Sequence, residues 1–436
     1  MTTVPSPGLP EVVRDVEPSE TETFRAIARP RRGFLFFLIF AAIGSAAVQM
    51  STVLLTLSLK ANALSPTDAT SILSLATGVS GVVALVGLPI VGRLSDRTRS
   101  RFGRRRPYLL AAAIILPLGS LVLLFAADAW TLAVANLLIT TGSICVGVTT
   151  YALVAEQLPN DRRGPASALL NLATPIGALI GIGISQPFGG NLTAMALLPA
   201  VLAVVSVVLF VVVLRDPQVV HTKAPAGRLL DLIGIFWVNP FRFPDFFFVF
   251  TSRMLVFCGV AAINSFQAIF LLAHLGYQPQ DLGSAILLTV VINAAITLLV
   301  APTVGKISDR IGRRKPFVFI AALILAAGLV MAAVSETFGA YLVAVAVIAV
   351  GQGVYFSVEL ALATQVLPDP ENPAKDLALI NVANNLPVSL VAVLAPMILS
   401  FGVGSNEPRN FSALFIAGAL AVVVGGILIT FIRKAK

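Results

Sequence analysis

The chain has few of the side chains that build metal centres, disulfide frameworks or catalytic sites. Its 436 residues include two cysteines and two histidines, and only 12% of the residues are charged. Cys145 and Cys258 both lie in apolar runs, so neither a disulfide framework nor a Cys- or His-based metal site is expected. Without a Ser-His-Asp set or a phosphate-binding loop, the sequence predicts no enzyme and no cofactor. Because a soluble domain is about a quarter charged, the shortage of charge excludes an ordinary globular protein and a disordered chain.

Long apolar runs make up most of the sequence instead. Hydrophobic residues account for 57% of the chain, and the mean hydropathy is +0.93. About 20 apolar residues span a bilayer, so each run of roughly that length predicts a membrane-spanning helix. Twelve runs predict an all-α membrane protein, with spans at 34–59, 71–92, 108–127, 130–153, 167–185, 193–214, 246–273, 282–304, 317–334, 338–362, 377–400 and 411–432.

The charges outside these runs are unevenly placed. Residues 1–32 are polar and rich in Pro, Ser and Thr, without a signal-peptide pattern, and we expect a disordered cytoplasmic tail. With this end inside, all 30 Lys and Arg residues except Lys60, Arg409 and the intramembrane Arg253 fall on the cytoplasmic side. The positive-inside rule then predicts that both termini are cytoplasmic. We expect an integral multi-pass protein of the plasma (inner) membrane. We expect the basic residues to meet anionic lipid, and no nucleic-acid partner.

The chain also contains an internal repeat. Gly92 to Pro107 reads GRLSDRTRSRFGRRRP, and Gly305 to Pro316 reads GKISDRIGRRKP. The sequence ALVAEQLPND, from Ala152, is echoed by ALATQVLPDP, from Ala361. Parallel six-span halves that meet at a central cavity are typical of transporters. The repeat predicts an N-terminal bundle at 33–214, a cytoplasmic linker at 215–245 and a C-terminal bundle at 246–436.

The repeated loop resembles a signature of the major facilitator superfamily, G-x-x-x-D-R-x-x-G-R-R, with four extra residues in the first copy. A second family signature is similar to the residues after span four, namely Tyr151, Glu156, Pro159, Arg163 and Gly164. The longer first loop, the segment NPFRFPDF at 239–246 and Arg253 resemble the sucrose-transporter and glycoside-pentoside-hexuronide branches. The resemblance implies the major facilitator fold, in which two pseudo-symmetric six-helix bundles form one monomeric carrier.

The charged loops are candidates for a gate. Asp96 and Asp309 stand at C-terminal helix ends, whose dipoles they oppose, so each needs cationic partners. The predicted gating residues are Asp96, Arg97, Arg104, Arg105, Glu156 and Arg163 in the first half and Asp309, Arg310, Arg313 and Arg314 in the second. The alternative is that such arginines only anchor the protein to lipid, which we favour for Arg99, Arg101 and Arg106.

Two ionisable residues lie well inside spans, where charge is costly and usually functional. Arg253 in span seven and Glu359 in span ten are at similar depth and could pair across the C-terminal half. We predict that they couple transport to protons. The alternative is a buried ion pair that only stabilises helix packing.

Neutral amides are the other polar groups inside the spans. Because amides both donate and accept hydrogen bonds, a cavity rich in them suits a solute with many hydroxyls. In the superfamily the first helix of each three-helix unit lines the cavity, which implies substrate contacts by Gln49, Asn136, Asn264, Gln267, Gln352 and Tyr355 above the span-eleven cluster of Asn381, Asn384, Asn385 and Ser389. The alternative is that such groups join helices.

The resulting hypothesis is a secondary active transporter that imports a sugar or glycoside by alternating access, coupled to protons. The main alternative is a drug or metabolite efflux antiporter of the same superfamily. Span five, which reads ATPIGALIG from Ala173, lacks the glycine and proline pattern of antiporters. A membrane sensor would need a sizeable output domain, for which the sequence leaves no room.

Overall fold

The computed structural model describes residues 31–98, 100–216, 242–366, 374–401 and 409–432. Within these ranges, twelve helices are long and apolar enough to cross a membrane. The prediction of an all-α protein with twelve spans is confirmed. The expected tail at 1–32 lies almost wholly outside the described residues, as does most of the expected linker at 215–245.

Six spans form each half. The N-terminal half contains α2 (Phe34–Ser51), a π-helical turn η2 (Thr52–Thr56) and α3 (Leu57–Leu64) as its first span, then α4 (Ala69–Arg97), α5 (Arg106–Phe125), α6 (Ala129–Gln157), α7 (Asn160–Asn171) with α8 (Ala173–Ser185) and the 3-10 turn η3 (Gln186–Phe188), and α9 (Leu192–Val213). The C-terminal half contains α11 (Pro244–Ala273), α12 (Leu282–Ile311), α13 (Lys315–Ala333), α14 (Phe338–Thr364), α15 (Ala374–Leu399) and α16 (Phe411–Thr430).

Some helices extend beyond the apolar runs that predicted them. The second span continues past residue 92 to Arg97, and the fifth begins at Asn160 instead of 167. Arg97 in the last turn of α4 and Asp161 in the first turn of α7 complement the helix dipoles and so favour these extra polar turns. Hydropathy alone cannot detect such turns, because they lie outside the apolar part of the helix.

The two halves repeat the same helix crossing. A methyl group built on Gly119 or Gly142 would lie within 3.0 Å of α6 or α5 atoms, and one on Gly328 or Gly351 would lie equally close to α14 or α13 atoms. The partners in these four close approaches are Ile139, Leu116, Ile348 and Leu325. Every C-terminal residue of this set follows its N-terminal counterpart by the same number of positions. The crossing of α5 with α6 is therefore repeated, residue for residue, by α13 with α14.

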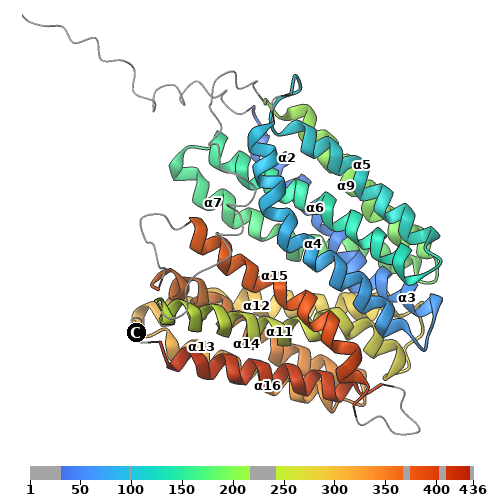
Figure 1. Cartoon of the computed structure of the whole chain (residues 1–436), viewed down its shortest axis with the longest axis vertical. Helices are drawn as coiled ribbons and strands as arrows, with labels where there is room; N and C mark the ends of the chain where they lie inside the picture. Colours follow the sequence, from blue (N-terminus) through green and yellow to red (C-terminus); the bar gives the residue numbers. More distant parts are fainter. Residues whose placement is uncertain (1–30, 99, 217–241, 367–373, 402–408, 433–436) are drawn as a thin grey trace, which may run out of the picture.

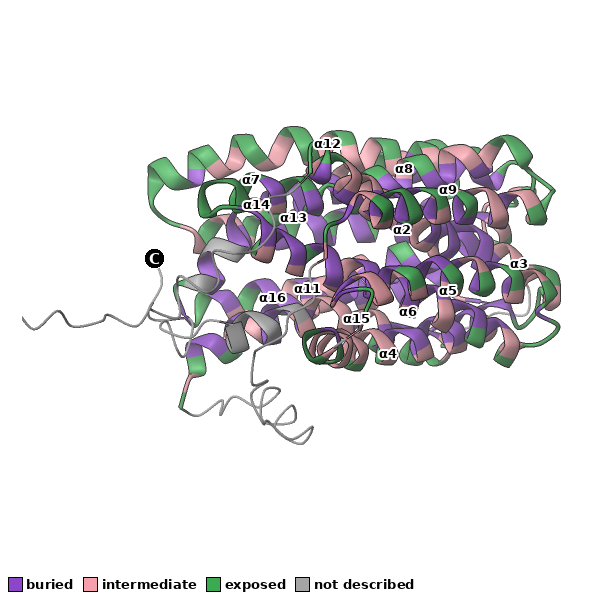
Figure 2. Cartoon of the chain, turned by 90° about the horizontal axis from the view of Figure 1, so that it is seen from above, coloured by how far each residue is buried: buried purple, intermediate pink, exposed green. Residues whose placement is uncertain are grey.

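Figure 1 shows the halves side by side, with the N-terminal half in blue and green and the C-terminal half in yellow to red. Helix α15 packs against α4, and η2 and α3 meet α11. In Figure 2 the outer helix α12 is mostly exposed. Its most apolar segment is 17% buried, against 72% for α11, so α11 is a central helix, whereas α12 is exposed along much of its length and also meets α8 and η3 of the other half.

Some of the contacts between the two halves lie together at one end of the molecule. We call the end with Arg104, Arg105 and Arg314 the arginine-rich end, and the end with the connections 65–68, 189–191 and 274–281 the opposite end. At the opposite end, a methyl group on Gly189 would lie 2.2 Å from the Gln280 carbonyl, and one on Gly283 would lie 3.1 Å from Gln186 Cα. Only glycine allows this approach of two backbones. The halves are therefore tightly apposed at the opposite end.

Candidate functional site

A cluster of charged residues forms at the arginine-rich end of the N-terminal half. Arg105 is only 3% exposed, and its guanidinium donates to Ser95 Oγ at 2.6 Å, to Asp96 Oδ1 at 2.8 Å and to Glu156. Arg104 also pairs with Asp96, at 2.9 Å. Burial lowers the pKa of Arg105, but its hydrogen bonds to Glu156 and Asp96 and their charge outweigh that effect, so the pKa is raised. The pairing predicted for Asp96, Arg104, Arg105 and Glu156 is confirmed.

Asp216, which sequence reasoning missed, completes this cluster. Its carboxylate accepts the backbone N–H groups of Arg105 at 2.5 Å and Arg106 at 2.8 Å, at the start of α5. Gly103 has φ 103° and a methyl group there would lie 2.4 Å from Asp216 Cγ. The turn Ser100–Gly103, at the four-residue insertion, thus makes room for the carboxylate of Asp216, which follows the end of α9. No local sequence signal pairs residues so distant in the chain.

The corresponding loop of the C-terminal half is more open. Asp309 pairs with Arg314 at 3.5 Å, and the Asp309 side chain is 72% exposed against 54% for Asp96. Arg310 and Arg313 are exposed. The two repeated loops are therefore similar in sequence but differ in their ion pairs.

Two further predicted gating residues lie at the rim of the N-terminal cluster. Arg97 is exposed at the end of α4. Arg163 is also exposed, and its Nε donates to the Leu158 carbonyl at 2.9 Å. This bond ties Arg163 to the turn between α6 and α7.

A buried ion pair joins the two central helices of the C-terminal half. Arg253 on α11 contacts Glu359 on α14, and the two residues are 8% and 3% exposed. Arg253 Nε also donates to Asn384 Oδ1 on α15 at 2.6 Å. The predicted pairing of Arg253 with Glu359 is confirmed. Asn384 belongs to the span-eleven cluster that the family resemblance ranked lower, so its contact with Arg253 was not predicted.

An aromatic wall lines this pair. The Arg253 guanidinium lies 5.4 Å from the Phe257 ring centre, and Tyr355 meets Phe257 edge-on at 6.3 Å. Tyr355 is 1% exposed. Among the described residues, neither the Tyr355 hydroxyl nor Glu359 Oε1 has a hydrogen-bond partner. The ion pair and the neighbouring Tyr355 therefore have buried polar atoms without hydrogen-bond partners among the described residues.

The predicted amides take three kinds of position. Asn136 is buried, and its Nδ2 donates to the Ala76 carbonyl and to Ser80 Oγ on α4, which is a helix-joining role. Gln267 accepts a bond from Thr289, and Gln352 accepts one from Asn293 at 3.0 Å, both on α12. Asn264 is exposed within an otherwise buried stretch of α11. The structure thus places Gln352 against α12 and Asn136 against α4.

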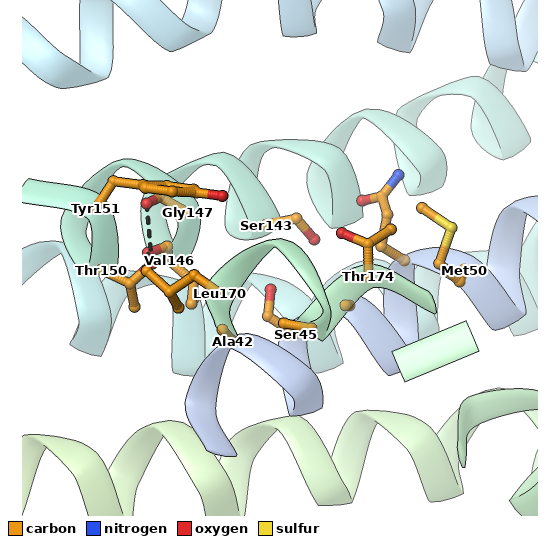
Figure 3. Close-up of a pocket in the computed structure, with 13 residues that line it drawn as sticks. Ala42, Ser45, Met50, Ser143, Val146, Gly147, Thr150, Tyr151, Leu170 and Thr174 are labelled. Atoms are coloured by element: carbon orange, nitrogen blue, oxygen red, sulfur yellow. Dashed lines mark hydrogen bonds between the residues drawn. The ribbon is translucent and has the colours of Figure 1, made fainter. Parts of the chain in front are cut away.

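Gln49 lies at a cavity of about 160 Å³ in the N-terminal half, where α2, α6, α7 and α8 meet (Figure 3). Its Nε2 donates to Thr140 Oγ1 at 3.4 Å. The other lining residues are Ala42, Ser45, Ala46, Met50, Ser143, Val146, Gly147, Thr150, Tyr151, Leu170, Ala173 and Thr174. Gln49 was predicted to line a cavity and does so here, whereas isolated Ser and Thr residues in spans are also typical of helix packing.

Metal binding has no support in the described part of the chain. No group of three or more His, Cys, Asp or Glu side chains is placed there to hold an ion.

Comparison with known proteins identifies relatives among transporters. Residues 33–296 and 249–436 match the sequence model of the Major Facilitator Superfamily. A D-xylose transporter of Levilactobacillus brevis is 31% identical over 148 residues, 34% of this chain and 31% of that protein. An ectoine/proline transporter of Corynebacterium glutamicum is 24% identical over 393 residues, 82% of this chain and 74% of that protein. A general alpha-glucoside permease of Schizosaccharomyces pombe is 27% identical over 190 residues, 37% of this chain and 34% of that protein.

Solved structures share the fold. A nucleoside transporter superposes with a TM-score of 0.69 at 16% identity, covering 92% of this chain and 100% of that one. A D-xylose–proton symporter gives 0.67 at 17% identity, covering 92% and 98%. At such identities the likeness establishes the arrangement of the helices alone.

Proposed function

The chain belongs to the major facilitator superfamily, and from this premise we propose that it is a proton-coupled secondary transporter of a small polar solute, a sugar or glycoside. The observation that carries the proposal is the buried pair of Arg253 and Glu359. An ion pair that only stabilised the bundle would be an expensive choice, because desolvation offsets much of its attraction.

The pair is suited to carry a proton. If Glu359 moves away from Arg253 during the transport cycle, its charge is left uncompensated in an apolar interior, and binding a proton removes that charge. When the pair re-forms, Arg253 favours the ionised carboxylate and the proton leaves. Proton movement would then follow the conformational cycle. Glu359 Oε1, which has no hydrogen-bond partner among the described residues, is the atom available to be protonated.

The conformation supports alternating access between the two halves. Gly189 and Gly283 keep the backbones in close contact at the opposite end. At the arginine-rich end, Asp96 pairs within the N-terminal half and Asp309 within the C-terminal half. We assign this state as closed at the opposite end. By the positive-inside rule, the arginine-rich end and both termini lie on the cytoplasmic side of the membrane, which we take to be the plasma membrane.

The preference for a sugar rests on chemistry and on relatives. The amides of Gln49, Asn264 and Gln352 and the hydroxyls near them are neutral donors and acceptors, which suit hydroxyl groups. The relatives named above include a D-xylose transporter and an alpha-glucoside permease. The loop SDRTRSRFGRRRP and Arg253 favour the sucrose-transporter and glycoside-pentoside-hexuronide branches.

A transport assay tests the proposal directly. Purified protein in proteoliposomes is given a panel of labelled sugars and glycosides, first in counterflow and then with an imposed pH gradient. Counterflow of at least one member and its uphill accumulation with the proton gradient are expected. If the panel is inert while apolar cations are moved against the gradient, the protein is an efflux antiporter instead.

A further inference from the structure

The guanidinium of Arg253 is held by two other helices. Its Nε donates to Asn384 Oδ1 on α15 at 2.6 Å, and its Nη1 contacts Glu359 Oε2 on α14. It also lies over the Phe257 ring, 5.4 Å from the ring centre. The position of the guanidinium is therefore fixed by an amide and an aromatic ring as well as by the carboxylate.

The second oxygen of Glu359 is left open. Glu359 Oε1 is buried and accepts no hydrogen bond from any described residue. Arginine commonly binds a carboxylate through two parallel N–H groups, and one edge of the guanidinium that can do so includes Nε. Because Asn384 occupies Nε, that edge is closed to Glu359. The amide thus prevents one of the forked arrangements that would engage both carboxylate oxygens.

Arg253 is the charged group that acts on Glu359 within the described chain, and Tyr355, one turn earlier on α14, is the other titratable side chain beside it. The part of α15 from residue 379 onward has no charged side chain. The helices α11, α12 and α13 carry their other described charges near the arginine-rich end, namely Asp245, Lys306, Asp309, Arg310 and Lys315. A change in how Asn384 holds Arg253 should therefore register directly in the protonation of Glu359.

The internal repeat indicates that the fold does not require a charge at this position. At the spacing set by the paired glycine crossings, Thr150 of α6 corresponds to Glu359 of α14. Thr150 is buried, and its hydroxyl donates to the carbonyls of Val146 and Gly147 on its own helix, both at 2.9 Å. The N-terminal half thus packs the same crossing with a self-satisfied threonine. The ion pair and its amide are therefore a feature of the C-terminal half alone.

We propose that Asn384 is a positioning residue that, by holding Arg253 Nε, limits Arg253 to one oxygen of Glu359 and so sets the pH at which the other oxygen takes up a proton. The assignment rests on the proposed function, whose coupling residue it concerns. Asn384 itself neither gains nor loses a proton. It acts through Arg253, which stabilises the ionised carboxylate less with one contact than with a fork.

An infrared titration of the full chain in lipid nanodiscs reads the protonation of Glu359 without turnover or a pH gradient. The carbonyl-stretch band of a protonated carboxyl is assigned to Glu359 by its absence from Glu359→Gln. In Asn384→Leu, Nε is released to Glu359, so the band should appear at a pH lower by about one unit or more. In Asn384→Asp, a second carboxylate shares Arg253, so the first proton should be taken up at a pH higher by about one unit or more.

Ser389→Ala is the matched control. Ser389 lies on the same helix, and its buried hydroxyl makes no hydrogen bond to any described residue, so this variant should titrate like the wild type. Thermal unfolding verifies the fold of each variant. Asn384→Asp keeps the size of the side chain, so its shift remains readable even if Asn384→Leu does not fold.

Opposite shifts distinguish positioning from support of the fold, which would move neither titration or move both alike. The assignment is overturned if the folded Asn384 variants titrate like Ser389→Ala, if both shift in the same direction, or if Glu359 shows no protonated band at any pH at which the chain is folded. Uptake that ignores a pH gradient, together with opposite shifts, would contradict the proposed coupling and leave the role of Asn384 intact.

Discussion

Arg409 donates a hydrogen bond to the carbonyl oxygen of Thr67 at 2.6 Å, joining residues 342 positions apart and on opposite halves. The same guanidinium bonds the Pro66 carbonyl and is 8% exposed. Burial lowers the pKa of Arg409, and the charge of Asp68 partly opposes this. Arg409 therefore links the two halves by hydrogen bonds at the opposite end.

Removing the hydrogen bonds of Arg409 should favour opening of the opposite end. We expect Arg409→Ala to lengthen the distance between spin labels at Thr193 and Glu336, which are exposed on different halves at that end. The measurement is double electron–electron resonance in nanodiscs. Lys60→Ala is the control, because Lys60 bonds the Leu124 carbonyl at 2.7 Å within a single half. An unchanged distance distribution in Arg409→Ala would show that the glycine contacts alone hold this end closed.

The unequal charge clusters predict unequal effects on turnover. Asp96 bonds both Arg104 and the buried Arg105, whereas Asp309 is mostly exposed and pairs with Arg314 at 3.5 Å. Asp96→Asn should therefore slow transport more than Asp309→Asn, with substrate affinity changed by no more than about a few fold, because a gate is altered and not the pocket. Initial rates and equilibrium binding separate these effects. A large loss of affinity with normal turnover would place Asp96 in substrate binding.

The orientation can be tested with impermeant thiol reagents in a background without Cys145 and Cys258. A cysteine at Ser100 should be shielded in intact cells, because the arginine-rich end is assigned to the cytoplasm. A cysteine at Asn191, on the opposite end, should be labelled. The reverse pattern of labelling would invert the assignment of the two ends.

The sequence was sufficient for the spans and for the central ion pair. Apolar length fixes a membrane helix, and Arg253 and Glu359 had few other partners because so few charges lie inside the spans. Asn136 shows the limit of this reasoning, since an amide inside a span suits a cavity and a neighbouring helix equally well. Its hydrogen bonds to α4 appear only in the folded structure.

Contacts between distant segments were the other limit. Asp216 caps the start of α5 across more than a hundred residues, and no local pattern indicates such a partner. Asn384 was ranked low because the family resemblance favours other helices, yet it binds Arg253. The cavity forms where α2, α6, α7 and α8 meet, so the Ser and Thr residues of any one span could not locate it.

Substitutions of Arg253 and Glu359 should have strongly non-additive effects on the free energy of unfolding. Arg253→Met leaves the Glu359 carboxylate buried without its partner, which typically costs about 3–5 kcal/mol. Adding Glu359→Gln removes the stranded charge and should recover much of that loss. Thermal unfolding of the purified single and double variants measures the coupling. Additive losses would mean that the two side chains contribute to folding independently.

The coupling role of Glu359 is separable from transport itself. Glu359→Gln keeps the size of the side chain but cannot take up a proton, so the carrier should still exchange substrate across the membrane, since exchange needs no net proton step. Uphill uptake driven by a pH gradient should be lost. Glu336→Gln is the control, because Glu336 is an exposed carboxyl outside the membrane-spanning helices. If Glu359→Gln still accumulates substrate against its gradient, Glu359 is a structural partner of Arg253 and protons are carried elsewhere or not at all.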